Sequence, residues 1–196
     1  MSKPSKNNLH IEKAVQALYS DSIPPMRDEN MILTSSDRLR RSRLYVPGNQ
    51  PKKILNAGTY SPDCIILDLE DSVPPNEKDK ARIIIRNALR MAHFQGAERM
   101  VRINSGEDGL TDLEFIIAQN VHAILIPKVE SSDQIVRINN TINEILKVCG
   151  REEPVFIIPI IESAHGVLNA LEIAESSPNI IGLTIGLEDY TADLGI

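Results

Sequence analysis

The sequence predicts an α/β protein, a TIM-type (β/α) barrel in which about six of the eight βα units are present and the C-terminal part is missing. Short apolar runs alternate with amphipathic stretches from Arg43 onward, and each βα piece spans roughly 25 to 40 residues. The apolar runs are nearly continuous, which is typical of strands buried on both faces of a parallel sheet. We therefore expect parallel strands joined by helical crossovers.

Six apolar runs are predicted as strands, and the segments between them as helices. The strands are residues 44–46, 64–69, 100–103, 123–126, 156–161 and 180–185. Residues that favour helix ends mark the helices: Pro51 in a first turn, Asn76 capping residues 77–91, a capping box from Thr111 to Glu114, a helix from Ser132 that Gly150 ends, and a helix over residues 164–176.

Composition excludes several classes of function. A net charge of -6 with 42% hydrophobic residues indicates an ordinary globular core and argues against a nucleic-acid binder. No apolar run approaches the length of a membrane span, and the N-terminus lacks an apolar signal region. Cys64 and Cys149 do not form a disulfide framework, so we expect a reducing compartment and a cytoplasmic location.

The chain divides into two parts. Residues 1–40 are polar and are predicted to be a partly disordered N-terminal extension with one short helix, and residues 41–196 an incomplete barrel domain that ends in the loop after the sixth strand. Six strands would leave apolar edges exposed at the first and sixth strands, which folded proteins avoid. We therefore expect a fragment or a truncated gene product, in preference to a sheet that another chain completes.

Charged side chains follow five of the six strands, at the rim where barrel enzymes place their chemistry. Each instance alone is a weak signal, but together two cations and several carboxylates indicate an anionic substrate held beside a metal. The strand ends are Pro47-Gly-Asn49, Asp68-Leu-Glu-Asp71, Arg102-Ile-Asn104, Pro127-Lys128, Glu162 and Glu188-Asp189.

Glu162 and Asp189 are the predicted metal ligands, with Glu188 as the rival to its neighbour. Mg²⁺ takes one or two carboxylates and completes its shell with water and substrate oxygens, so two protein ligands suffice. The alternative is structural: Glu162 would begin the following helix, where an acid favours the helix dipole, and Asp189 would be a loop acid or a helix cap.

Arg102 is the predicted substrate-binding and catalytic residue, because its planar guanidinium suits a carboxylate. The alternative is a structural ion pair with Asp68 or Glu70. The group Asp68, Glu70 and Asp71 is also a candidate support for Arg102 and the metal. Lys128 fits a structural role or a peripheral phosphate contact better than a Schiff-base nucleophile, which needs a desolvated pocket.

Several nucleotide and hydrolase motifs do not occur in the sequence. It contains no G-x-G-x-x-G, no Walker loop, no H-E-x-x-H and no G-x-S-x-G. Their absence argues against a dinucleotide or nucleoside-triphosphate site, a zincin and an α/β-hydrolase.

Six motifs in order resemble the citrate lyase beta-subunit (citryl-CoA lyase) family, within the HpcH/HpaI aldolase/citrate lyase superfamily. The resemblance covers roughly residues 38–196. The motifs are Arg41-Ser-Arg-Leu-Tyr-Val-Pro-Gly48, Leu67-Asp-Leu-Glu-Asp-Ser-Val73, Val101-Arg-Ile-Asn104, Ile126-Pro-Lys128, Ile161-Glu-Ser-Ala164 and Gly186-Leu-Glu-Asp-Tyr-Thr-Ala-Asp-Leu-Gly195.

The resemblance implies a Mg²⁺-binding TIM barrel, usually oligomeric, that makes or breaks a carbon–carbon bond beside a CoA or acyl-carrier thioester. It implies that Arg102 contacts substrate and that Glu162 and Asp189 ligate the metal, with Glu162 also beside the substrate. Family members continue beyond the length of this chain, and in some relatives the additional segment closes over a neighbouring subunit's site and brings a catalytic acid.

The predicted function is a Mg²⁺-dependent lyase that cleaves a 3-hydroxy-3-carboxyacyl thioester such as citryl-CoA to oxaloacetate and acetyl-CoA. The expected partners are the thioester, an oxaloacetate-type dicarboxylate and further copies of the chain, with no nucleic acid and no membrane. The alternatives are a malyl-CoA-type lyase, a 2-keto acid aldolase, or a non-catalytic truncated chain that binds CoA or an oligomer partner. The sequence assigns neither a general acid nor a general base.

Overall fold

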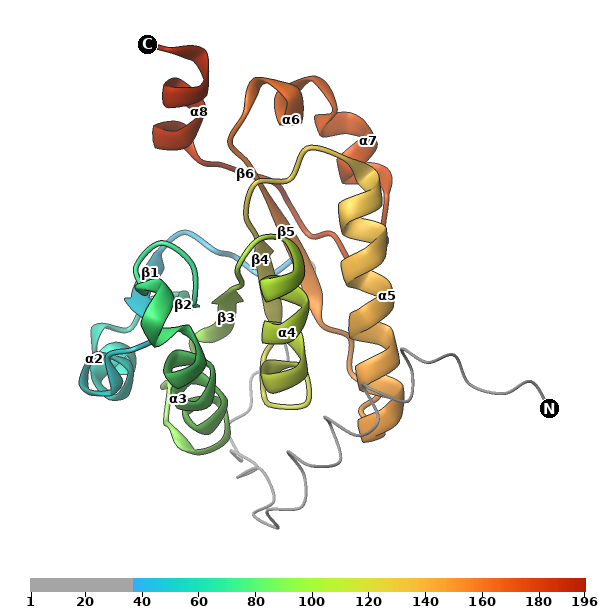
Figure 1. Ribbon diagram of the computed structural model, residues 1–196. Coiled ribbons are helices and arrows are strands. Elements are labelled where there is room, and N and C mark those ends of the chain that lie inside the picture. Colours follow the sequence, from blue (N-terminus) through green and yellow to red (C-terminus); the bar gives the residue numbers. More distant parts are fainter. Residues whose placement is uncertain (1–36) are drawn as a thin grey trace, which may run out of the picture.

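Six parallel strands lie in chain order in one curled sheet, with helices packed on its outer side (Figure 1). The structure is a computed structural model that describes residues 37–196. The predicted N-terminal extension, with its short helix, lies almost entirely outside the described residues. The arrangement is that of a partial TIM-type barrel, as the sequence predicts.

The strands confirm the predicted apolar runs. Two predicted strands match to the residue, and only the sixth is much shorter than expected. The apolar run 180–185 contains Gly182, a residue that weakens strands, and it pairs with β5 only at its two ends. The strands are β1 Arg43–Pro47, β2 Cys64–Asp68, β3 Glu98–Arg102, β4 Ala123–Ile126, β5 Phe156–Ile161 and β6 Thr184–Ile185.

The helices follow the strands as crossovers. In the described part of the chain, no helix is long and apolar enough to cross a membrane. A capping box between Ser131 and Gln134 begins α5, and Gly150 ends it in a left-handed conformation, as predicted. The helices are α2 Pro51–Asn56, η1 Ala57–Tyr60, η2 Pro75–Glu77, α3 Lys78–Met91, α4 Gly106–Ile116, α5 Ser132–Cys149, α6 Ala164–Leu168, α7 Ala170–Glu175 and α8 Leu187–Leu194.

Three helix predictions were wrong. Asn76 does not cap α3: it lies inside η2, and Glu77 is the cap residue. Thr111 does not begin a helix: α4 begins at Gly106, and the Thr111 hydroxyl donates a hydrogen bond to the carbonyl of Glu107 inside it. The predicted helix over residues 164–176 is two helices that meet at Asn169, whose φ of -98° and ψ of 6° are not helical. The Asn169 side chain instead donates to the Glu130 carbonyl at 2.8 Å, a bond typical of asparagine away from regular structure.

The sheet separates two apolar clusters, which confirms that the strands are buried on both faces. The larger cluster packs the sheet against the helices, and the smaller one lines the inner, concave side. Side chains alternate between the faces, so residues two apart along a strand share a face. Cys64 and Ile66 lie in the inner cluster, as does Met100. The same alternation therefore turns Asp68 and Arg102 inward at the carboxyl edge of the sheet.

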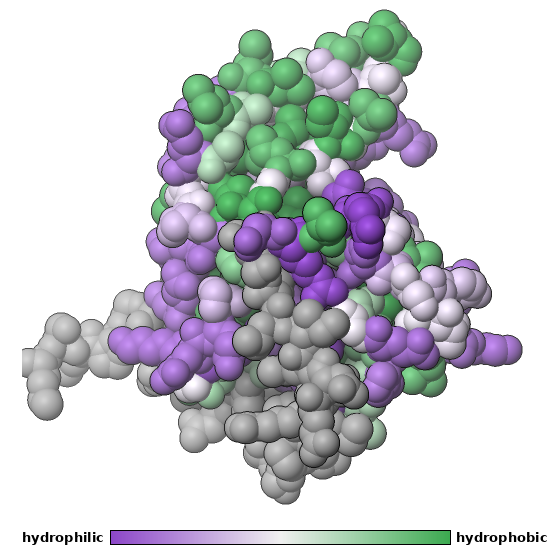
Figure 2. Space-filling model, turned by 180° about the vertical axis from the view of Figure 1, so that it is seen from behind, coloured by the Kyte–Doolittle hydropathy of each residue, from purple (hydrophilic) through white to green (hydrophobic). Residues whose placement is uncertain are grey.

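The last quarter of the chain carries exposed apolar side chains. In Figure 2 hydrophobic residues gather over the end of the molecule formed by α6, α7 and α8. A side-chain hydrogen bond of 2.9 Å from Arg43 on β1 reaches Thr184 on β6, so the curl of the sheet brings its first and last strands near each other. The exposed side chains are Val167, Leu168, Leu171, Leu183, Ile185, Leu187, Leu194 and Ile196.

A buried ion pair joins the outer helices to the end of β3. Asp112 on α4 is fully buried and accepts from Arg82 Nε on α3 at 2.6 Å. Its second oxygen accepts from both the backbone and the side-chain nitrogen of Asn104, at 2.7 and 2.8 Å. Asn104 lies two residues after Arg102, so this network fixes the loop that follows the substrate-binding candidate.

We expect Asp112→Ala to lower the free energy of unfolding by about 3 kcal/mol, because it leaves a buried guanidinium and a buried backbone N–H without their partner. Urea unfolding followed by circular dichroism measures the loss. Asp108→Ala is the matched control: its carboxylate lies 3.5 Å from the same guanidinium but is exposed, and we expect a loss below about 1 kcal/mol. Equal losses in the two variants would contradict a structural role for the buried pair.

Candidate functional site

Arg102 and Asp68 are neighbours in the sheet register and form the centre of the site. Arg102 Nε and Nη2 donate to the two oxygens of Asp68, each at 2.7 Å, in a two-pronged pair. Asp68 also accepts the backbone N–H groups of Glu70 and Ser72, at 3.0 and 3.1 Å. The structural ion pair named as an alternative for Arg102 is therefore present, and it orients the guanidinium at the rim.

The third nitrogen of the guanidinium faces two more carboxylates. Arg102 Nη1 lies 2.9 Å from Glu70 Oε2 and donates to Asp71 Oδ2 at 3.2 Å. The ring of Tyr45 on β1 covers the guanidinium, with 5.4 Å between its centroid and Arg102 Cζ. All three carboxylates of the segment after β2 thus contact Arg102, as expected of a supporting group. Of the three, Asp71 is the exposed one.

These contacts decide the charge states. Burial opposes the charge of Arg102, but its hydrogen bonds to Asp68 and the nearby carboxylates outweigh that effect and raise its pKa. Burial likewise raises the pKa of Asp68, while its hydrogen bonds from Arg102 and Ser72 outweigh burial and lower that pKa overall. The pair therefore stays ionised on both sides across the physiological range.

Glu162 directly follows β5 and is held on two sides. Its Oε1 accepts the backbone N–H of Lys128 at 2.7 Å, and a Cβ added to Gly186 would lie 2.4 Å from its Oε2. The alternative in which Glu162-Ser163 starts the next helix holds for Ser163, which is the cap of α6 and accepts from Gly166 N–H at 3.1 Å, whereas Glu162 lies just before the cap. Glu162 is buried at the end of β5, so its carboxylate belongs to the rim of the sheet and not to the helix that follows.

The sequence predicts a loop after the sixth strand at Asp189, and this prediction is wrong. Asp189 lies in the first turn of α8, next to Glu188, where acids are favoured by the helix dipole. Burial raises the pKa of Glu162, and the charge of Asp189 raises it further, which places the two carboxylates within electrostatic reach of each other. Gly186, the residue before α8, lies against Glu162, so the helix that carries Asp189 begins beside the other predicted ligand.

Lys128 connects the two halves of the site, which the sequence did not reveal. Its Nζ lies 3.3 Å from Glu70 Oε1, while its backbone N–H binds Glu162. The backbone φ of Lys128 is 53°, in the left-handed region, which is a strained conformation for a residue other than glycine. The charge of Glu70 raises the Lys128 pKa, and half of the side chain is exposed, which does not fit a neutral amine nucleophile.

The donor atoms fit a hard divalent cation with few protein ligands. In residues 37–196 no three His, Cys, Asp or Glu side chains are close enough to hold a metal by themselves. Glu162 and Asp189 supply carboxylate oxygens only, and Glu162 Oε2 packs so closely against Gly186 that a side chain at this position would clash with it. This arrangement suits Mg²⁺, which keeps several waters, better than Zn²⁺, which takes three or four nitrogen and sulfur ligands.

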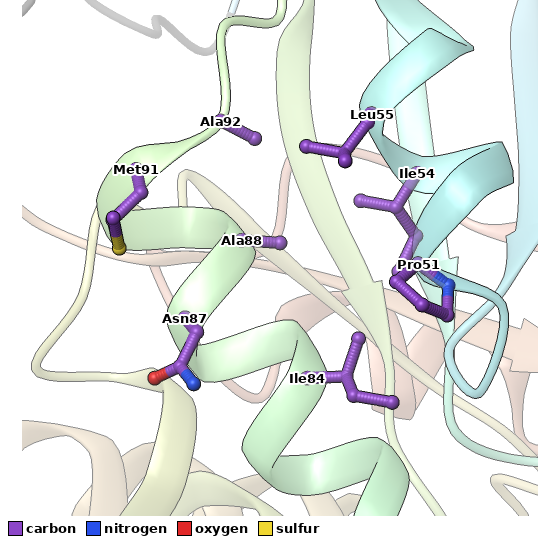
Figure 3. Close-up of a pocket in the computed structure, with 8 residues that line it drawn as sticks. All are labelled: Pro51, Ile54, Leu55, Ile84, Asn87, Ala88, Met91 and Ala92. Carbon is purple, nitrogen blue, oxygen red and sulfur yellow. The ribbon is translucent and has the colours of Figure 1, made fainter.

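A separate cavity lies on the outer side of the sheet, between α2 and α3 (Figure 3). Its volume is about 420 Å³, and its walls are apolar apart from Asn87. None of the rim residues lines it, so it is not part of the candidate site. The lining residues are Pro51, Ile54, Leu55, Ile84, Asn87, Ala88, Met91 and Ala92.

The sequence model of the HpcH/HpaI aldolase/citrate lyase family matches residues 41–196, which hold every residue of the rim described above. The chain belongs to this family. The match covers the whole predicted barrel domain and agrees with the six motifs found in the sequence.

The curated relatives that this chain matches are named as lyases. The citrate lyase subunit beta of Haemophilus influenzae is 39% identical over 160 residues, which are 80% of this chain and 55% of the relative. The mitochondrial citramalyl-CoA lyase of Homo sapiens is 36% identical over 168 residues, 80% of this chain and 49% of the relative. The chain thus spans about half the length of the curated relatives that it matches.

Solved structures of the family have the same fold. The citrate lyase beta subunit from M. tuberculosis, complexed with oxaloacetate and magnesium, superposes with a TM-score of 0.62 at 28% identity and covers 80% of this chain and 63% of that one. The protein CitE from the same organism was solved with magnesium, acetoacetate and coenzyme A, with a TM-score of 0.62 at 29% identity, covering 80% and 53%. Most of this chain therefore has the fold of the corresponding part of these solved structures.

We expect Gly186→Ala to weaken Mg²⁺ binding at least about tenfold, because the added methyl group displaces the Glu162 carboxylate. Isothermal titration calorimetry with MgCl₂ measures the affinity. Gly182→Ala is the matched control, since a Cβ there meets no atom within 4 Å. Unchanged affinity in Gly186→Ala would show that Glu162 Oε2 takes no part in binding the cation.

Proposed function

We propose that this chain forms the metal- and substrate-binding part of a Mg²⁺-dependent carbon–carbon lyase. The proposed reaction is the reversible cleavage of a 3-hydroxy-3-carboxyacyl thioester, such as citryl-CoA, to oxaloacetate and acetyl-CoA. The observation that carries the proposal is an oriented guanidinium, Arg102, at the same rim as the carboxylates Glu162 and Asp189, in a chain of this family. The names of its relatives, citrate lyase subunit beta above all, support the same reaction.

Arg102 would bind a substrate carboxylate. Asp68 occupies two of its nitrogens in the buried part of the site, whereas its Nη1 is shared by Glu70 and the exposed Asp71. An incoming carboxylate can replace Asp71 on Nη1 with little cost, because an exposed ion pair contributes little stability. The guanidinium would then offset negative charge as the carbon–carbon bond breaks.

Glu162 and Asp189 would hold the cation, and the backbone N–H of Lys128 fixes the first of these carboxylates. With Oε1 engaged at 2.7 Å by that N–H, the second oxygen of Glu162 lies against Gly186, where only a glycine leaves room for the carboxylate. When bound, Mg²⁺ would act as a Lewis acid toward the substrate hydroxyl and the adjacent carboxylate. The protein's own contribution is a preset pair of oxygen ligands.

A malyl-CoA-type substrate is the second candidate. The L-malyl-CoA/beta-methylmalyl-CoA lyase of Cereibacter sphaeroides is 31% identical over 164 residues, 81% of this chain and 52% of the relative. The same Arg102 and the same two carboxylates would serve either thioester, so the rim by itself does not separate them. Assembly into a homo-oligomer and a cytoplasmic location belong to this proposal as well.

The test is Mg²⁺-dependent cleavage of citryl-CoA by the purified chain, with malyl-CoA in parallel. We expect oxaloacetate from citryl-CoA, detected by its reduction with malate dehydrogenase and NADH, and its loss with EDTA. Glyoxylate from malyl-CoA alone would establish the second candidate. A folded chain that binds Mg²⁺ and cleaves neither thioester would contradict a lyase activity of this polypeptide.

We expect Glu162→Gln to lower the Mg²⁺ affinity at least about a hundredfold, because a neutral amide replaces a charged oxygen ligand. The same titration with Glu144→Gln provides the control, since Glu144 lies exposed on α5. If Glu162→Gln binds Mg²⁺ as the wild type does, the metal assignment is wrong.

A further inference from the structure

Glu70 lies between the two cations of the site. Only 6% of the residue is exposed. Its Oε2 is 2.9 Å from Arg102 Nη1, and its Oε1 is 3.3 Å from Lys128 Nζ. Arg102 is the substrate-binding candidate and Lys128 holds the metal ligand Glu162, so Glu70 is the carboxyl group that both parts of the site share.

The charges around Glu70 do not balance. Asp68, Glu70 and Asp71 together face Arg102 and Lys128, so one carboxylate exceeds the cations in contact. Asp68 already takes two of the guanidinium hydrogen bonds. Lys78 on α3 also approaches, but its Nζ donates to the backbone carbonyls of Leu69 and Glu70, each at 2.6 Å, and not to a carboxylate.

The excess negative charge is relieved most easily by a proton on the Glu70 carboxylate. Its Oε2 is buried and makes no hydrogen bond, although Arg102 is near. The Asp71 carboxylate meets the same nitrogen, Arg102 Nη1, so two carboxyl groups crowd one donor, and such crowding favours a proton on one of them. Burial, with the nearby Asp71 carboxyl group, raises the pKa of Glu70 to about 7.

We propose that Glu70 is the proton-exchanging carboxyl of this site, the group that accepts the hydroxyl proton of the substrate as its carbon–carbon bond breaks. This inference rests on the proposed function. The substrate O–H bond breaks and its proton goes to the Glu70 carboxylate, while the hydroxyl carbon becomes a ketone. The electron pair of the broken carbon–carbon bond goes to the thioester enolate. The proton then held on Glu70 is available to the enolate carbon, so the step balances without another reactant.

The neighbouring groups suit this role less well. Asp68 is locked to Arg102 with a lowered pKa. Asp71 is largely exposed, and Lys128 has a raised pKa and stays charged. Glu162 is engaged by the Lys128 backbone and serves as a metal ligand in the proposed function. A general base operates best when both of its protonation states are populated near the working pH, which Glu70 satisfies.

The protonation part is tested by ¹³C NMR of the chain labelled at glutamate Cδ, titrated between pH 4 and 9 without metal. We expect one glutamate to titrate between pH ~6 and 8, well above the ordinary range, and its signal to vanish in Glu70→Gln but persist in Glu144→Gln. In Asp71→Asn the same midpoint should fall by about one unit, because an amide can donate to the ionised Glu70. The proposal is overturned if no glutamate that titrates above pH ~5.5 is lost in Glu70→Gln. A second signal that persists belongs to another glutamate, such as Glu162, whose pKa burial also raises.

The catalytic part is tested by lyase kinetics across pH with the same variants. We expect Glu70→Gln to lower kcat by at least about a hundredfold, to keep KM within about threefold, and to lose the fall in rate below neutral pH. Glu70→Asp, which keeps the carboxyl group, should recover part of kcat. A drop in Mg²⁺ affinity in Glu70→Gln, with kcat unchanged at saturating metal, would instead assign Glu70 to metal support and overturn the proton-exchange role. A wild-type chain without lyase activity overturns the proposed function and the role in catalysis, while the NMR titration still decides the protonation of Glu70.

Discussion

The ion pair between Asp68 and Arg102 is the interaction on which the site depends. The two residues are adjacent in register at the ends of β2 and β3, and their side chains point to the inner face of the sheet. Burial makes this pair costly to break, because either partner alone would be an unpaired charge. With two nitrogens of Arg102 engaged, the third is presented to Glu70, Asp71 and the open rim.

The second half of the site is organised by backbone atoms. The Lys128 N–H fixes one oxygen of Glu162, and the absence of a side chain on Gly186 makes room for the other oxygen. Lys128 then joins the halves through its contact with Glu70. A preset arrangement of this kind avoids the cost of ordering ligands when the cation binds. The strain at Lys128 is located where it orients a ligand, as strained backbone often is.

Residues 41–196 match the family, and every group to which the proposed chemistry assigns a role lies between Tyr45 and Asp189. The same chain spans about half the length of its curated relatives. The exposed apolar side chains belong to β6 and to α6 to α8, the part of the chain that carries the proposed metal ligand Asp189, whereas Arg102 lies among well-buried strands. Within the described residues, the proposed substrate-binding side at Arg102 is therefore more firmly packed than the side that carries Asp189.

The sequence by itself determined the strands and the residues at their ends. A strand that is buried on both faces is a continuous apolar run, and such a run can be recognised from neighbouring residues alone. It placed Arg102, Glu162 and Asp189 at one rim for the same reason. It failed for Thr111, where a polar pattern matched a capping box that the fold does not use, and for Asp189, whose helix the short final segment did not reveal. Only the tertiary structure decided the link through Lys128 and the excess carboxylate at Glu70, since both depend on charges that meet across strands and are distant in the chain.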